Sequence, residues 1–146
     1  MNDVDKVVAD LVDRFGRAQV LSSISKIDDH ERRVLTLISN KGLHPPPIEY
    51  MRGEVYYVTE GAIDFSNISE FENILDTAIL KLKEKLDERR WEAIFLIPFG
   101  PVVLNMHIKM AVFRTLWIDT RDIVYLGNSR YGLIERDSRN ALFDDE

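Results

Sequence analysis

One stretch of the sequence predicts the class of the fold: Glu92-Ala-Ile-Phe-Leu-Ile-Pro-Phe-Gly-Pro101. Its apolar run from Ala93 to Ile97 does not alternate with polar residues, which is typical of a strand covered on both faces in a parallel sheet. Pro98 and the pair Gly100-Pro101 then end the strand and start a helix with proline at its first position. The free amides at such a helix start carry positive partial charge and can hold a phosphate or a carboxylate.

The helix that follows, residues 101–116, is predicted to be apolar on almost every side. A helix with so little polar surface is normally covered by its own sheet and by a second layer, such as a partner subunit. We therefore expect self-association through residues 101–117, with the amino-terminal helix as the competing interface. His107 is interpreted as a satisfied interface histidine rather than a catalyst.

Upstream, residues 34–39 fit either a buried strand or part of a helix that runs over residues 28–42. We favour the strand because Val34, Thr36 and Ile38 are β-branched and the loop residues 39–42 follow directly. Residues 45–47 are three prolines, which predict a rigid loop or, less simply, a recognition motif. A second strand is expected over residues 54–59, closed by Glu60-Gly61.

A long amphipathic helix is predicted next, and Ser69 with Glu72 fits a capping box at its start. The basic residues near its end are interpreted as a solvated face matched to the helix dipole, and a nucleic-acid site is the alternative. After the 101–116 helix, residues 122–128 and 130–136 are expected to form an antiparallel hairpin that turns at residues 127–129.

The amino-terminal segment from Asp3 to about Ser25 has apolar residues at spacings of three and four, which predicts an amphipathic helix. Gly16 lies inside it and favours a kink or a split there. This helix packs either on the sheet of its own domain or on a partner. The last residues, 138–146, are expected to form a loose acidic tail.

Composition limits the functions that fit. The 146 residues carry a net charge of -6, and the isoelectric point is near 5.1. These values argue against a broad surface for duplex nucleic acid, which needs clustered basic residues. The sequence holds no cysteine, no apolar run of membrane-spanning length and no secretory pattern at its start. We expect a cytoplasmic protein without disulfides or a membrane span.

The order of these elements predicts a single α/β domain over residues 1–146. The expected architecture is a three-layer Rossmann-like fold with a mostly parallel sheet, an antiparallel edge hairpin and an extra amino-terminal helix. Within it we assign residues 1–27 to that helix, 33–137 to the core and 138–146 to the tail.

Over residues of about 33 to 137 the pattern resembles the CARF and SAVED sensor domains of prokaryotic antiviral systems. The pieces that carry the resemblance are Leu96-Ile-Pro-Phe-Gly-Pro101 and the segment from Ile123-Val-Tyr125 through Tyr131. Members of these families bind cyclic oligonucleotides over the strand ends, often across a two-fold axis, and some cleave the ring. The resemblance implies a ligand near Ser39, Asn40, Lys41 and Gly42 and near Phe99, Gly100, Pro101 and Asn105.

Physical chemistry gives these residues plausible roles. The amides around Gly42 and Pro101 and the charge of Lys41 suit phosphates, and Asn105 or Asn128 suits a base edge. Three functions stay open: a sensor or sequestering domain for a cyclic oligonucleotide or other small anion, a ring nuclease using Ser39 or Lys41, and a partner-binding module. The domain would work as a homodimer or with a separate effector protein. No ligand spacing for a metal and no cofactor motif is present, and no catalytic residue is assigned.

Overall fold

A computed structural model of the chain describes residues 2–42, 45–64 and 66–136. The chain divides into two compact units, Met1–Arg32 and Arg33–Glu146. The predicted acidic tail, residues 138–146, lies outside the described residues. None of the described helices is both long and apolar enough to cross a membrane.

The first unit consists of two helices, α1 (Asp3–Phe15) and α2 (Arg17–Glu31). They are separated at Gly16, whose φ of 83° is a conformation that few residues other than glycine adopt. The predicted break at Gly16 is confirmed. The predicted end near Ser25 is wrong, because α2 continues to Glu31 through residues that contain no glycine or proline.

The second unit is an α/β domain built on one five-stranded sheet. Its elements are β1 (Val34–Lys41), η1 (Ile48–Tyr50), β2 (Glu54–Glu60), α3 (Ile68–Asp87), β3 (Ala93–Ile97), α4 (Val102–Leu116), β4 (Arg121–Gly127) and β5 (Arg130–Ile134). The strand order is β2-β1-β3-β4-β5, and only the β4–β5 pair is antiparallel. The predicted α/β class, parallel sheet and edge hairpin are confirmed.

Strand β3 is the central strand, and all five of its residues are buried, as its uninterrupted apolar run predicted. Leu96 pairs with Leu37 of β1 on one side and with Asp122 of β4 on the other. Residues 34–41 form the strand that we favoured over a helix. The chain therefore leaves β1 toward β2 and then crosses back to β3, which creates a change of direction between β1 and β3.

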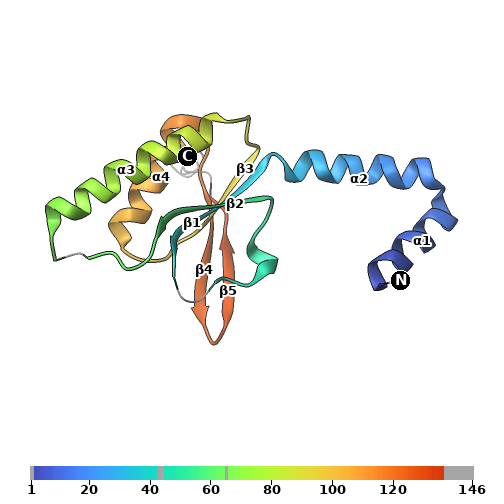
Figure 1. Cartoon of the computed structure of the whole chain (residues 1–146), viewed down its shortest axis with the longest axis horizontal. Helices are drawn as coiled ribbons and strands as arrows, with labels where there is room; N and C mark the ends of the chain where they lie inside the picture. The colour runs from blue at the N-terminus through green and yellow to red at the C-terminus, as the bar shows by residue number, and fades with distance from the viewer. Residues whose placement is uncertain (1, 43–44, 65, 137–146) are drawn as a thin grey trace, which may run out of the picture. The chain divides into compact units, whose positions relative to one another are not determined.

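Helices α3 and α4 lie side by side on one face of the sheet (Figure 1). Their buried residues pack with those of the sheet in the larger hydrophobic core: Leu75, Ala78, Leu82 and Leu86 from α3, and Leu104, Ile108, Ala111 and Val112 from α4. Both crossovers run in the same direction across the sheet, so right-handed connections place both helices on one face.

The other face of the sheet is covered by the segment around η1 instead of a long helix. Tyr50 and Met51 pack there against a second buried cluster that includes Phe95. Thr36 fixes this segment, because its hydroxyl donates to the Arg52 carbonyl at 2.6 Å and accepts from the Arg52 amide at 2.9 Å. Among the described residues of this unit, the segment forms the layer on that face.

The starts of the two core helices differ from the sequence prediction. Helix α3 begins at Ile68, and its cap is Asn67, whose side chain accepts a hydrogen bond from the Glu70 amide at 3.1 Å. The predicted capping box of Ser69 and Glu72 is therefore wrong, because both residues already lie within the helix. In α4, Pro101 is the residue before the first helical position rather than the first position itself.

Candidate functional site

The carboxyl ends of β1 and β3 are joined by one buried side chain, Ser39. Its hydroxyl donates to the Phe99 carbonyl at 2.6 Å and accepts from the Phe99 amide at 2.5 Å. Ser39 is fully buried, at 0% exposure. The loops at residues 39–42 and 99–101, near which the family resemblance implies a ligand, meet at this edge, and Ser39 holds the second loop against the first.

Asn40 extends this contact to the loop after β2. Its side-chain nitrogen donates to the Gly61 carbonyl at 3.0 Å, and its side-chain oxygen accepts from the Thr59 hydroxyl at 3.0 Å. A Cβ added at Gly100 would lie 3.7 Å from the Cβ of Asn40, which is ordinary contact, but Gly100 has a φ of 72° that disfavours other residues. Asn40 thus fixes the edge at the point where three loops converge.

Lys41 and Gly42 border a hollow of about 650 Å³ together with Glu60, Gly61 and Ala62. The Gly61 amide donates to the Lys41 carbonyl at 3.1 Å, so the two loops form a continuous wall. The Lys41 ammonium lies 5.2 Å from the centre of the Tyr57 ring, a cation–π contact. Lys41 is exposed, and its charge is accessible to an anion that enters the hollow.

The start of α4 supplies the backbone donors of the edge. Pro101 is its cap and makes no side-chain capping bond, and the first intrahelical hydrogen bond runs from the Asn105 amide to the Pro101 carbonyl at 3.3 Å. The amides of residues 102–104, which come before Asn105 in the first turn, therefore have no acceptor within the helix. With the helix dipole they favour negative charge at this end of α4.

Asn105 stands one turn into α4 and faces the same turn of chain. Its side-chain nitrogen donates to the carbonyls of Phe99 and Pro101, each at 3.0 Å. Its side-chain oxygen is buried and has no partner among the described residues. In this conformation Asn105 stabilises the 99–101 turn and leaves one acceptor unused.

Asn128 is not brought to these residues. It lies in the turn between β4 and β5, where it and Ser129 have φ values of 52° and 58°. The pairing of β4 with β3 ends at Asp122, and β4 then continues to Gly127. At about 3.3 Å per residue, Asn128 projects well beyond the end of β3. The hairpin overhang is visible in Figure 1.

The loop after β2 also contributes to this edge of the sheet, although none of its residues was predicted there. Thr59 is buried, and its hydroxyl bonds the Ser39 carbonyl at 2.7 Å as well as Asn40. The signal available in the sequence was the pair Glu60-Gly61, which ends a strand parallel to β1 and so must reach the same edge.

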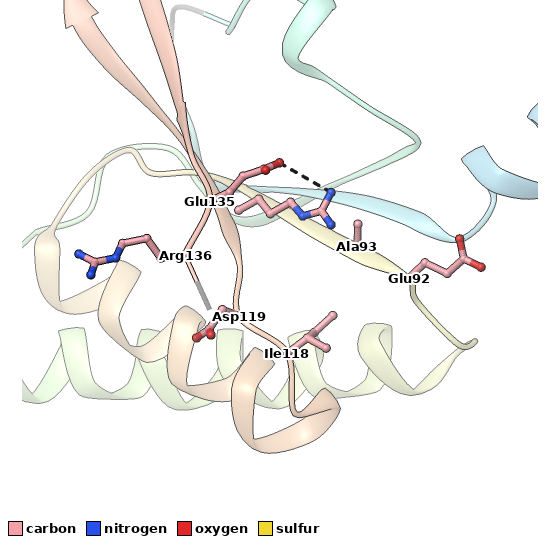
Figure 2. A pocket seen from close by; sticks show the side chains of 7 residues that line it. Glu92, Ala93, Ile118, Asp119, Glu135 and Arg136 are labelled. Atoms are coloured by element: carbon pink, nitrogen blue, oxygen red, sulfur yellow. Dashed lines mark ion pairs between the residues drawn. The ribbon is translucent and has the colours of Figure 1, made fainter. Parts of the chain in front are cut away.

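A second hollow, of about 300 Å³, lies at the opposite edge of the sheet, where β3 and β4 begin (Figure 2). Its charged residues include Arg121 and Glu135, which form an ion pair at 3.8 Å, and both are about half exposed. Glu92 at its rim pairs with Arg33 at 2.9 Å. Opposite charges at this edge thus neutralise one another. This hollow is therefore a weaker site for an anion than the carboxyl edge of the sheet.

Metal binding has no structural support in the described part of the chain, since no group of three or more histidine, aspartate or glutamate side chains is placed to hold an ion there. A scan against protein-family models and searches of curated proteins and of solved structures find no match to this chain.

Proposed function

We propose that this chain binds a small anionic ligand of the nucleotide type, specifically a cyclic oligonucleotide, at the carboxyl edge of β1 and β3. The observation that carries the proposal is the Ser39–Phe99 contact, which fixes the start of α4 beside the 39–42 loop. In open α/β sheets, ligands bind outside the carboxyl ends of the strands where the strand order changes direction. Here that position lies between β1 and β3.

The proposed contacts follow from this geometry. The first-turn amides of α4 would hold one phosphate, and the exposed ammonium of Lys41 would pair with another at the rim of the hollow beside the 39–42 loop. Ser39, Asn40 and Asn105 would act as positioning residues, because their hydrogen bonds go to the loops themselves. A sensor or sequestering role in prokaryotic antiviral defence or counter-defence rests on the resemblance to CARF and SAVED domains.

The test is a thermal-shift panel of cyclic di-, tri- and tetranucleotides with the full chain. A ligand at about 100 times its dissociation constant should stabilise the fold by roughly 2.7 kcal/mol. Lys41→Ala should weaken binding and reduce its salt dependence, because one charge contact is lost. Lys83→Ala, an exposed lysine on α3, is the matched control and should bind as the unchanged chain does.

Analysis of the nucleotide after several hours separates binding from cleavage, which is the ring-nuclease alternative. The proposal fails if no member of the panel shifts the melting temperature, or if Lys41→Ala and Lys83→Ala behave alike.

A second function is favoured by the outer face of α4, which is apolar. Val103, Met106, Met110 and Trp117 are 46%, 56%, 42% and 66% exposed. With Phe113 they follow spacings of three and four residues, the pattern of a helix that packs on another helix. We propose that two copies pair through this outer face of α4, so that the nucleotide site works within a homodimer.

A further inference from the structure

The first unit contains an apolar groove that none of its own described residues fills. The groove lies between α1 and α2, has a volume of about 440 Å³ and is bordered by Val8, Leu11, Phe15, Val20, Ile24 and Ile27. Phe15 and Ile27 are 62% and 63% exposed. Of these six residues only Val20 is buried, so the two helices cover little of each other's apolar surface.

Two helices of this size are not expected to be stable with so open a core. They contain 13 and 15 residues, and isolated helices of about 12–15 residues are marginal in water. Helix α1 contains no buried residue at all. Its capping box, formed by Asn2 and Asp5, stabilises only the first turn. The missing stabilisation must come from a body that fills the groove.

We propose that the groove is filled by the same two helices of a second copy of this chain, which gives an intermolecular four-helix bundle. The apolar residues of α1 that begin at Val4 recur at spacings of four, three and four, and those of α2 that begin at Val20 recur at four and three. This is the repeat of left-handed helix bundles. Because each copy presents the same groove and the same stripes, a two-fold axis satisfies both copies at once.

The exposed apolar area supports a second copy. Eight large apolar side chains of the unit are between 38% and 69% exposed: Val4, Val7, Val8, Leu11, Phe15, Leu21, Ile24 and Ile27. Together they offer on the order of 700 Å² of surface, close to the roughly 800 Å² per partner of a standard interface. The apolar surface that the two helices expose is therefore close in size to what a standard interface needs.

Charge also favours a second copy over a lipid surface. Residues 1–32 hold five basic and seven acidic side chains, a net charge of -2, so two units repel each other only weakly. Helices that lie on anionic membranes are instead rich in lysine and arginine on their polar face. Helix α1 carries four aspartates against Lys6 and Arg14.

A cross-linking experiment tests the groove directly, because the sequence holds no cysteine that could interfere. Ser23 borders the groove, whereas its neighbour Ser22 does not. A flexible bismaleimide should join two full-length Ser23→Cys chains at micromolar concentration at least about tenfold more efficiently than two Ser22→Cys chains. Equal cross-linking of the two variants, or none, would overturn the proposal.

Sedimentation then measures the association constant of the bundle. All chains carry Met106→Glu, which removes the contact proposed for α4. Ile27→Glu should weaken self-association at least about 100-fold, since each buried isoleucine contributes to both halves of a two-fold interface. Ile68→Glu is the matched control, because Ile68 is 71% exposed, against 63% for Ile27, but lies on α3. Two outcomes would refute a second copy as the occupant of the groove. In one, the Met106→Glu chain stays monomeric at about 100 μM; in the other, it binds neutral or anionic vesicles and does not self-associate.

Discussion

Helices α3 and α4 lie on the same face of the same sheet, yet their outward surfaces are opposite in character. Inward they are alike, because each buries four apolar residues in one core. Outward, α3 presents mostly glutamate, lysine and aspartate, as in Glu72, Asp76 and Lys83, whereas α4 presents Val103, Met106 and Met110. Packing on the sheet explains the apolar inward faces of both helices. Exposure to water explains the polar outward face of α3, but nothing in the fold explains the apolar outward face of α4.

The apolar excess of α4 is therefore not required by this domain's own core. A solvent-facing helix gains nothing from exposed methionine and valine, and contiguous apolar patches on a protein surface mark sites of interaction. The starts of the two helices also differ. Helix α3 is capped by the side chain of the adjacent residue Asn67, whereas the turn before α4 is held by Ser39 of the distant strand β1. Helix α4 is thus tied to the proposed ligand edge at one end and to a proposed interface along its length.

The largest effects should appear on the inward faces, where the helices are equivalent. Leu82 of α3 and Leu104 of α4 are both fully buried. Leu82→Ala and Leu104→Ala should each lower the free energy of unfolding by about 2–5 kcal/mol, measured in urea, because each leaves a cavity in the core. A loss below 1 kcal/mol at either position would show that the helix concerned does not belong to the core.

The outward faces should then separate the helices. Met106 of α4 and Leu80 of α3 are 56% and 62% exposed. In an Ile27→Glu background, which removes the contact proposed for α1 and α2, Met106→Glu should weaken dimerisation by about 10- to 100-fold in sedimentation, since a buried methionine contributes roughly 1.5–3 kcal/mol. Leu80→Glu should leave the dimer unchanged. If both variants have the same association constant, the outer face of α4 is an ordinary surface and the comparison fails.

The helix starts are the next contrast. Ser39→Ala removes both hydrogen bonds to Phe99 and should lower the free energy of unfolding by about 1–3 kcal/mol, because buried backbone groups lose their partner. Asn67→Ala removes the cap of α3, which is exposed, and should cost about 0.5–2 kcal/mol. Only Ser39→Ala should also weaken ligand binding. A Ser39→Ala chain with unchanged stability would remove the role of Ser39 in holding the α4 turn.

The smallest contrast concerns one lysine on each helix that pairs with a strand carboxylate. Lys85 of α3 pairs with Glu54 of β2 and with Glu88, and Lys109 of α4 pairs with Asp122 of β4 at 2.5 Å. Partial burial lowers the pKa of Lys85, but its hydrogen bonds with Glu54 and Glu88 outweigh burial and raise the pKa above its ordinary value of 10.5.

Because the pKa of Lys85 is raised in the folded state, its stabilisation is complete below pH 10.5 and is lost as the pH rises through the folded pKa. Lys85→Met should therefore cost about 1 kcal/mol at pH 7, and the difference from the unchanged chain should shrink in alkali. Urea titrations at pH 7 and above pH 10.5 measure it. A difference that grows with pH would contradict the assignment of the charge pair.

The elements of the core were predictable because local rules decide them. The apolar run of β3, the proline and glycine residues after it and the alternation of strands with helices need no distant partner to be recognised. The loops at residues 39–42 and 99–101 were expected to meet for a general reason, since parallel strands end at one edge of a sheet. The break at Gly16 was equally local.

What the sequence could not show depends on contacts between distant residues. Ser39 and Phe99 are 60 positions apart, so no spacing rule shows that the Ser39 hydroxyl is committed to a turn. Asn128 was grouped with the edge residues because the short register between β3 and β4, which leaves the hairpin projecting, has no local signature. The cap of α3 was misplaced because Asn67 and Ser69 are both good caps, and only the path of the preceding chain selects one.

The chain contains two tryptophans, and the structure gives them opposite surroundings. Trp91 is buried, at 6% exposure, beneath the guanidinium of Arg89, whereas Trp117 is 66% exposed at the end of α4 with its ring edge-on to Phe113. Pairing through α4 would move only Trp117 out of water. Dilution of the unmodified protein should therefore shift its fluorescence to longer wavelength and open one of two indoles to acrylamide quenching, which makes Trp117 an intrinsic optical reporter of assembly.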